Sequence, residues 1–383
     1  MRRSWLEPLL VFILVLVVYV GVTPETNQAY KHFVYMALGF LDARVDLPRL
    51  PGWYHDVIYV QGRVYAPFPP VPAVLLLPVV ALYGEATDQG RVGQIFAAGA
   101  VALFVAGLRR MGIGGAPRVF AATALAFGSV LWPATAIGTS WHYAQVVVVL
   151  ACAWLLWELA GTGRPLVIGA AAVMAWLTRL SLLPAVPVLA ALVWRRHPRP
   201  TSVAAFAAVN ALGVAVYLLY NHLRFGHALQ LGYPLLTMAA VNAEAYARYG
   251  FFNLHFVPEH LYAMFVRAPE LIATPPFLKP SPHGMALIFT SPVIARLFYP
   301  EGGARGWWPW GALILSTAVP MLFYFSTGWV QFGYRYSLDW WVFVLVLLAL
   351  AVGPRPKAGD YLLLALGIGA NAVGVFWVRT LGW

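Results

Sequence analysis

The stretch WLEPLLVFILVLVVYVGVTPETNQ, residues 5–28, decides how the chain begins to fold, because an apolar run passes directly into a polar turn. The run from 5 to 22 is close to the ~20 residues that a helix needs to cross a bilayer. Arg2 and Arg3 precede it as in a secretory signal, but no cleavage motif of small residues follows. We therefore expect an uncleaved first transmembrane helix, with Glu25 just beyond the hydrocarbon.

The composition is that of a membrane protein: 61% of the 383 residues are hydrophobic and 10% are charged. A soluble domain cannot bury so much apolar surface, so we predict an all-α polytopic membrane protein with a single membrane domain, 1–383. The single cysteine, Cys152, excludes a disulfide framework and a cysteine metal site. The net charge of +11 would suggest nucleic acid for a soluble protein. Here we assign the basic residues to cytoplasmic loops and expect no nucleic-acid partner.

Eleven apolar runs are candidates for membrane spans, although several are shorter than ~20 residues. They lie at 5–22, 91–108, 117–133, 141–159, 166–180, 182–194, 203–220, 285–299, 307–327, 338–353 and 359–377. The runs 166–180 and 182–194 could instead form one bent hairpin.

A further apolar run, 69–83, contains four prolines, and the charge pattern decides whether it spans. If it lies on the outer face, the basic short loops all fall on the side of the N-terminus, as the positive-inside rule requires. These loops carry Arg2, Arg3, Arg109, Arg110, Arg118, Arg164, Arg195, Arg196, Arg199, Arg305, Arg355 and Lys357. We therefore predict about eleven transmembrane helices, the N-terminus inside, the C-terminus outside, and 69–83 as a juxtamembrane or re-entrant helix.

Two long outer loops follow from this topology. The first, 23–90, is expected to carry a helix from Asn27 to Leu41 and a short hairpin with a Gln61-Gly62-Arg63 turn. The second, 221–284, contains an amphipathic stretch at 257–266. The histidines show no ligand spacing such as HExxH, so we assign no metal and no cofactor.

Two acidic residues of the first outer loop are candidate catalytic groups. Glu25, at the membrane boundary, is either a favourable charge in the first turn of a helix or a general base. Asp56 lies between aromatic residues in GWYHDVIYVQGRVY and either caps a turn or serves as a second carboxylate. We also assign His55, beside Asp56, to substrate binding.

Three arginines on the outer side run against the charge rule: Arg179, Arg224 and Arg335. An arginine near hydrocarbon is costly, so it either extends its side chain to the headgroups or has an anionic partner. A guanidinium suits a phosphate, because its planar fork can donate two parallel hydrogen bonds. We expect these arginines, with Tyr334 beside Arg335, to bind a lipid-linked phosphate.

The ordered landmarks of the chain resemble the membrane glycosyltransferases of the GT-C superfamily, which includes protein O-mannosyltransferases and aminoarabinose–lipid A transferases. After Pro24-Glu25 come DLP (46–48), GRVYAPFPPVPAVLLLPVVALYG (62–84), YNHLRFGHALQLGY (220–233), LIFTSPVIARL (287–297) and QFGYRYSLDWW (331–341), which are similar to stretches in uncharacterised bacterial members. The superfamily often has two adjacent acids early in the first outer loop; here the second position is Thr26.

The resemblance implies a glycosyltransferase of the bacterial inner membrane with its active site on the extracytoplasmic side. It would move a sugar from a polyprenyl-phosphate carrier to an acceptor that the sequence does not identify. Glu25 would be the base, and the membrane lipids would surround the carrier tail. A lipid-carrier flippase or transporter, or a non-catalytic subunit of a larger complex, are the alternatives. A flippase needs a charged path across the bilayer, and the predicted spans carry almost no charge at mid-depth.

Overall fold

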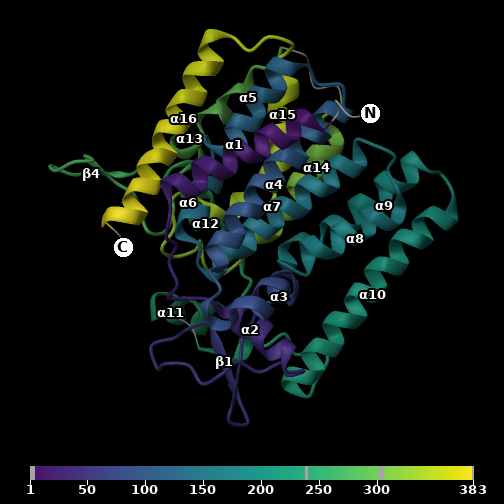
Figure 1. Ribbon diagram of the computed structural model, residues 1–383, viewed down its shortest axis with the longest axis vertical. Coiled ribbons are helices and arrows are strands. Elements are labelled where there is room, and N and C mark those ends of the chain that lie inside the picture. The colour runs from purple at the N-terminus through teal and green to yellow at the C-terminus, as the bar shows by residue number, and fades with distance from the viewer. Residues whose placement is uncertain (1–4, 238–239, 302–305, 382–383) are drawn as a thin grey trace.

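A computed structural model describes residues 5–237, 240–301 and 306–381, and the described part of the chain is mostly helical (Figure 1). Arg2, Arg3 and Arg305, used above to assign topology, lie outside the described residues. The α-helices are α1 (Leu6–Val22), α2 (His32–Leu41), α3 (Val71–Tyr83), α4 (Gln89–Arg110), α5 (Gly115–Ala126), α6 (Leu131–Ile137), α7 (Ser140–Leu159), α8 (Pro165–Trp176), α9 (Ala185–Arg196), α10 (Pro200–Phe225), α11 (Ala240–Tyr249), α12 (Val257–Phe265), α13 (Leu287–Thr290), α14 (Trp308–Met321), α15 (Trp341–Ala351) and α16 (Ala358–Phe376).

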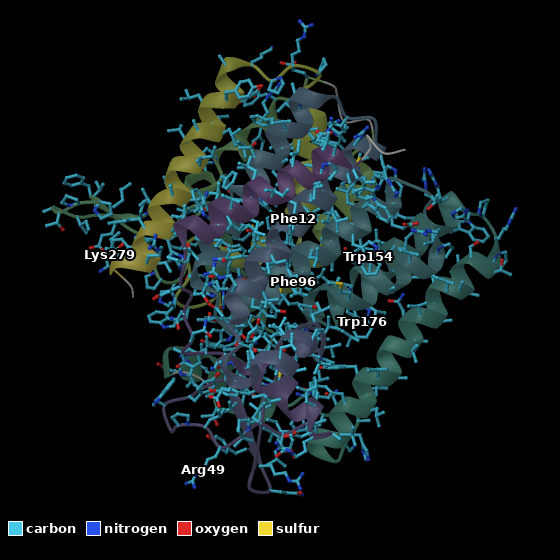
Figure 2. The ribbon with its side chains drawn as sticks, in the orientation of Figure 1. Phe12, Arg49, Phe96, Trp154, Trp176 and Lys279 are labelled. Atoms are coloured by element: carbon cyan, nitrogen blue, oxygen red, sulfur yellow. The ribbon has the colours of Figure 1, made fainter. Side chains whose placement is uncertain are left out.

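Five helical segments among the described residues are long and apolar enough to cross a membrane: Gln89–Arg110, Gly115–Ile137, Ser140–Leu159, Pro200–Phe225 and Ala358–Thr380. Most of α7 is buried (78% of its apolar window), whereas only 22% of the α10 window is buried inside the protein. A helix that is apolar on all sides is buried in the interior of a large protein or in a membrane. In this protein α4 and α7 lie at the centre of the bundle, and α10 and α16 lie at opposite edges (Figure 1). Figure 2 shows Phe96, Trp154 and Trp176 among these helices.

The run 285–299, predicted to be a span, is not a continuous helix. It forms α13, four residues long, followed by a 3₁₀ helix, Pro292–Phe298. Pro292 disfavours helical geometry at Ser291, which has a φ of −146°, so the α-helix ends there. The count of eleven spans stays a prediction.

The runs 166–180 and 182–194 form an antiparallel hairpin of α8 and α9, the alternative considered above. Their far ends meet, because Arg196 Nη2 donates to the Gly161 carbonyl at 2.5 Å and His197 Nε2 lies 3.1 Å from that of Gly163. Each helix has 12 residues, fewer than the ~20 needed to cross a bilayer alone.

Ion pairs hold one end of the helical bundle together, and we call it the basic end. The four acids on the side of the basic loops all pair there: Glu7 with Arg118 (2.8 Å), Glu158 with Arg164 (2.9 Å), Asp360 with Arg296 (2.8 Å) and Glu301 with Lys357 (2.6 Å). Apart from the local Glu158–Arg164 pair, these contacts connect segments far apart in sequence, so they gather basic loops at one end of the bundle.

The two long loops meet at the opposite end, which we call the site end. The strands β1 (Val57–Val60), β2 (Arg63–Tyr65) and β3 (Leu236–Thr237) form a sheet in the order β2-β1-β3. Both turn residues between β1 and β2 have positive φ (Gln61 50°, Gly62 76°), as a type I′ hairpin requires. The predicted hairpin is confirmed, and β3 ties the second loop to the first.

Three further loop predictions can be compared with the structure. The stretch 257–266 forms α12, as expected. The proline-rich run 69–83 forms α3, which packs on α2 at the site end (Figure 1). The first-loop helix, however, begins at His32 rather than Asn27. The preceding residues are not helical, and the Asn27 N–H donates instead to the Ile137 carbonyl at 3.2 Å.

The topology predicts that the two ends of the bundle face opposite sides of the membrane. In a Cys152→Ala background, Arg63→Cys at the β1–β2 turn should react with an impermeant maleimide from outside. Ala358→Cys, at the start of α16, should react only from inside. Both side chains are exposed, so access decides the outcome. Labelling of both positions from one side would contradict the assigned topology.

Candidate functional site

Asp56 lies at the site end, where the first loop enters β1. Its backbone has a φ of 56°, a left-handed conformation that aspartate tolerates better than most residues. Its N–H donates to the Thr237 carbonyl at 2.9 Å, which fixes it to the second long loop. Trp141, near the start of α7, donates from Nε1 to Asp56 Oδ2 at 2.8 Å. The carboxylate is thus held by a loop, a sheet and a helix together.

The electrostatic setting makes Asp56 a stronger proton acceptor than an ordinary aspartate. Burial raises the pKa of the Asp56 carboxyl, while His55, the Trp141 hydrogen bond and Arg335 act in the opposite direction, and the net shift is upward. A carboxylate whose pKa moves toward neutral pH is better matched to general base catalysis. Because of its raised pKa and its position where the two long loops meet, we take Asp56 as the centre of the candidate site.

His55 is held in an aromatic cluster beside Asp56. Its Nδ1 lies 2.8 Å from the Tyr30 hydroxyl, and its backbone carbonyl is 3.1 Å from His32 Nε2. The His55 ring lies 6.2 Å from that of Trp141 at an interplanar angle of 25°. The His55 ring nitrogen Nδ1 is thus engaged with Tyr30, and the assignment of His55 to substrate binding stays a prediction.

Arg335 is a buried cation whose guanidinium group could bind an anion. It is 7% exposed, and two of its guanidinium nitrogens, Nε and Nη1, have no hydrogen-bond partner among the described residues. Its charge acts on Asp56, yet no ion pair within 4.0 Å joins the two side chains. Asp56 therefore does not satisfy the two open nitrogens of Arg335.

His142 presents a second open nitrogen to the same region. It lies one turn before Gln145 on α7, and Gln145 Nε2 donates to the Arg335 carbonyl at 3.1 Å. Its Nδ1 is 2.8 Å from Thr139 Oγ1, and the buried Nε2 has no partner among the described residues. If the Thr139 hydroxyl donates to Nδ1, then Nε2 carries the proton and can donate to an anion.

Arg179 and Arg224 are placed differently from Arg335, because both already have partners. Arg179 Nε donates to Asp339 Oδ2 at 2.9 Å, and Ser181 shares that oxygen at 2.7 Å. Arg224 donates from Nη1 to the Ala66 carbonyl and from Nη2 to Asn221, each at 2.6 Å. Of the three predicted phosphate ligands, Arg335 alone has two buried guanidinium nitrogens without a hydrogen-bond partner among the described residues.

The structure also places Tyr334 and shows two residues that the sequence did not indicate. The Tyr334 hydroxyl is 2.7 Å from His260 Nδ1, so it ties η7 (Arg335–Asp339) to α12. Asp339, fully buried, is the counter-ion of Arg179. Tyr233 lies among the predicted residues: burial raises the pKa of its hydroxyl, and the charges of Arg179, Arg224 and Asp56 reach it. No spacing in the sequence indicates these long-range contacts.

Glu25 stands apart from this cluster. It is exposed, and no described residue forms an ion pair or side-chain hydrogen bond with it. The interpretation of Glu25 as a charge in the first helical turn is wrong, because α2 begins only at His32. The neighbouring Thr26 is fixed instead: its hydroxyl donates to Asp88 Oδ1 at 2.6 Å. Glu25 is thus an exposed carboxylate on an anchored segment.

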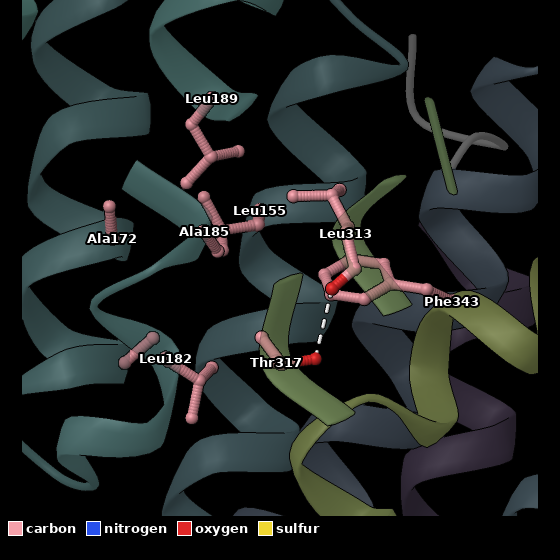
Figure 3. A pocket seen from close by; sticks show the side chains of 9 residues that line it. Leu155, Ala172, Leu182, Ala185, Leu189, Leu313, Thr317 and Phe343 are labelled. Atoms are coloured by element: carbon pink, nitrogen blue, oxygen red, sulfur yellow. Dashed lines mark hydrogen bonds between the residues drawn. The ribbon is translucent and has the colours of Figure 1, made fainter. Parts of the chain in front are cut away.

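A small apolar cavity lies inside the bundle and offers no polar chemistry. Its lining comes from α7, α8, α9, α14, α15 and the 3₁₀ turn Leu180–Leu182, and includes Leu155, Leu189, Leu313 and Phe343 (Figure 3). The single polar side chain in the lining, Thr317, donates its hydroxyl to the Leu313 carbonyl at 2.9 Å. We find no catalytic group there. Among the described residues, no group of His, Cys, Asp or Glu is arranged to hold a metal ion.

Comparisons with models of protein families, with curated proteins and with solved structures found no match. The interpretation of the site therefore depends on its own geometry.

The close packing of Gly138 against Thr26, the neighbour of Glu25, predicts how a substitution changes stability. Gly138 has a φ of 68°, and a Cβ there would lie 2.9 Å from the Thr26 Cβ. Gly138→Ala should therefore lower the free energy of unfolding by ~1–3 kcal/mol through backbone strain and this clash. Gly359→Ala, in open space on α16, is the matched control and should change it by less than ~0.5 kcal/mol. Equal thermal unfolding midpoints for the two variants would contradict this packing.

Proposed function

We propose that the chain is a membrane glycosyltransferase that moves a sugar from a polyprenyl-phosphate carrier to an acceptor at the site end. One observation carries the proposal: a carboxylate with a raised pKa, Asp56, lies within electrostatic reach of a buried guanidinium, Arg335, that forms no ion pair with it and has two nitrogens without a partner among the described residues. Transfer of a sugar from a phosphate needs these two groups, one to accept a proton and one to stabilise the departing anion.

In this mechanism the acceptor hydroxyl attacks the anomeric carbon as Asp56 takes its proton. The bond between that carbon and the phosphate oxygen breaks, and its electron pair leaves with the phosphate. Arg335 holds the phosphate through Nε and Nη1, and His142 Nε2 supports it. A single displacement inverts the configuration at the sugar carbon. Glu25 is retained as the alternative base, because it is exposed to an incoming acceptor.

A lipid-linked donor fits the setting better than a soluble one. The site end is reached by two helices long and apolar enough to lie in a membrane, α4 and α7, whose first residues, Gln89 and Ser140, both donate to the Tyr30 carbonyl of the first loop. A phosphate on a lipid would be presented at the ends of these helices, where Arg335 is buried. The sugar would then project toward the loops that carry Asp56 and the aromatic cluster of Tyr30, His55 and Trp141.

Turnover of a labelled polyprenyl-phosphate sugar distinguishes the two carboxylates. Asp56→Asn cannot accept a proton, so we expect kcat to fall by ~10²–10⁴-fold while donor binding is kept. Glu25→Gln should stay close to the wild-type rate. The measurement is initial rate against donor concentration on monodisperse protein. A normal rate for Asp56→Asn together with an inactive Glu25→Gln would show that Glu25 is the base. If the wild-type protein does not turn over the donor, the proposal is refuted.

The pH profile gives an independent test of Asp56 as the base. Only the ionised carboxylate accepts a proton, so kcat/KM should fall on the acid side as pH drops through the raised pKa of Asp56. The Trp141 hydrogen bond favours the ionised form, so Trp141→Phe should move this acid limb to higher pH. Trp53→Phe, which removes an exposed indole, is the control. An acid limb that does not move in Trp141→Phe would contradict the assignment.

A further inference from the structure

A hairpin in the second long loop projects from the bundle beside the end of α16 (Figure 1). It consists of β4 (Glu270–Leu271) and β5 (Leu278–Lys279), paired antiparallel. Its apolar residues face outward: Leu271 is 82% exposed and Phe277 57% exposed. Exposed apolar side chains of this size on a projecting element mark an interaction surface.

The base of the hairpin fixes its level along the bundle. The Ala286 N–H donates to the Arg267 carbonyl at 2.8 Å, which closes the base. The segment that follows packs on the loop before Arg335, where the Gln331 N–H donates to the Pro282 carbonyl at 3.3 Å. The hairpin therefore leaves the bundle next to the loop before Arg335, beside the C-terminal half of α16 (Figure 1).

The surfaces around the hairpin are also apolar. α16 exposes Leu362 and Leu366 along its outer side, as a helix in contact with lipid does. α12 buries His260 and leaves Phe265 and the following Val266 exposed. The hairpin thus continues an apolar surface that already runs along the outside of the bundle.

The hairpin is poorly suited to adding a strand from a protein partner. The turn contains Pro275 and Pro276, which have no N–H to donate. At the base, Lys279 and Glu270 are ion-paired at 3.9 Å, which places both charges away from the apolar tip. An apolar tip above a charged base is the pattern of an element that enters a lipid interface.

We propose that this hairpin, together with the exposed face of α12, inserts into the lipid interface of the membrane that the bundle spans and anchors the second long loop there. The anchor would fix the strand β3, and through it Asp56, at a constant height above the lipid. This inference concerns a lipid contact and does not depend on the proposed chemistry.

Fluorescence from single labelled cysteines tests the anchor. Leu271→Cys and Phe277→Cys, each with Cys152→Ala, are labelled with an environment-sensitive nitrobenzoxadiazole probe. The protein is reconstituted into vesicles of phosphatidylethanolamine and phosphatidylglycerol. The control is Tyr59→Cys in β1, an exposed aromatic position on the β1–β2 hairpin, and Leu366→Cys on α16 is the lipid-facing reference. Each variant is first checked for monodispersity, and two hairpin positions guard against the failure of one.

The anchor predicts that both hairpin probes emit at shorter wavelength than the Tyr59→Cys probe. They should be quenched by a doxyl group carried on lipid and lose most of their quenching by aqueous iodide. Iodide quenching equal to that of Tyr59→Cys, without quenching by the doxyl lipid, would overturn the proposal. Quenching that changes with the protein-to-lipid ratio would indicate a second copy of the chain as the occupant and would overturn it equally.

Discussion

The constraint on which the site depends is the burial of the Arg335 guanidinium with two unsatisfied nitrogens. Tyr336 contacts this guanidinium, but burying a charge with unsatisfied donors is costly, and the cost falls when an anion supplies the missing hydrogen bonds. Asp56, whose carboxylate interacts electrostatically with Arg335, forms no ion pair with it within 4.0 Å. Arg179, in contrast, has a buried counter-ion in Asp339. The protein therefore keeps one cation open at the site end while it pairs another nearby.

The separation of Asp56 from Arg335 is maintained by elements that have no freedom to bring them together. Asp56 is fixed by β3 through Thr237 and by α7 through Trp141. Arg335 is fixed by α7 through Gln145. Since both residues are held against the same buried helix, the distance between them is set by the bundle. The loops then decide what can enter the gap.

The sequence predicted the elements whose signals are local. The β1–β2 hairpin and α12 followed from turn residues and from amphipathic spacing, and Asp56 was identified between its aromatic neighbours. Local patterns could not distinguish Arg335 from Arg224, because the distinction lies in contacts distant in sequence: Arg224 donates to Ala66 in the first loop. The predicted helix start at Asn27 was wrong for a related reason, since the Asn27 N–H donates to the distant Ile137 carbonyl and not within a helix. The break at Pro292 was visible in the sequence but was outweighed there by hydropathy.

The most direct measurement of the central claim is the affinity of the purified protein for polyprenyl phosphate and for the polyprenyl alcohol of the same length. A hydrogen bond to a charged group contributes ~1.5–3 kcal/mol, so the phosphate should bind roughly tenfold tighter or more in the wild-type protein. Arg335→Ala should remove this difference and Arg335→Lys should restore part of it, whereas Arg49→Ala, at the exposed position labelled in Figure 2, should leave it unchanged. Equal affinity for phosphate and alcohol in the wild-type protein, or a preference that survives in Arg335→Ala, would contradict the account.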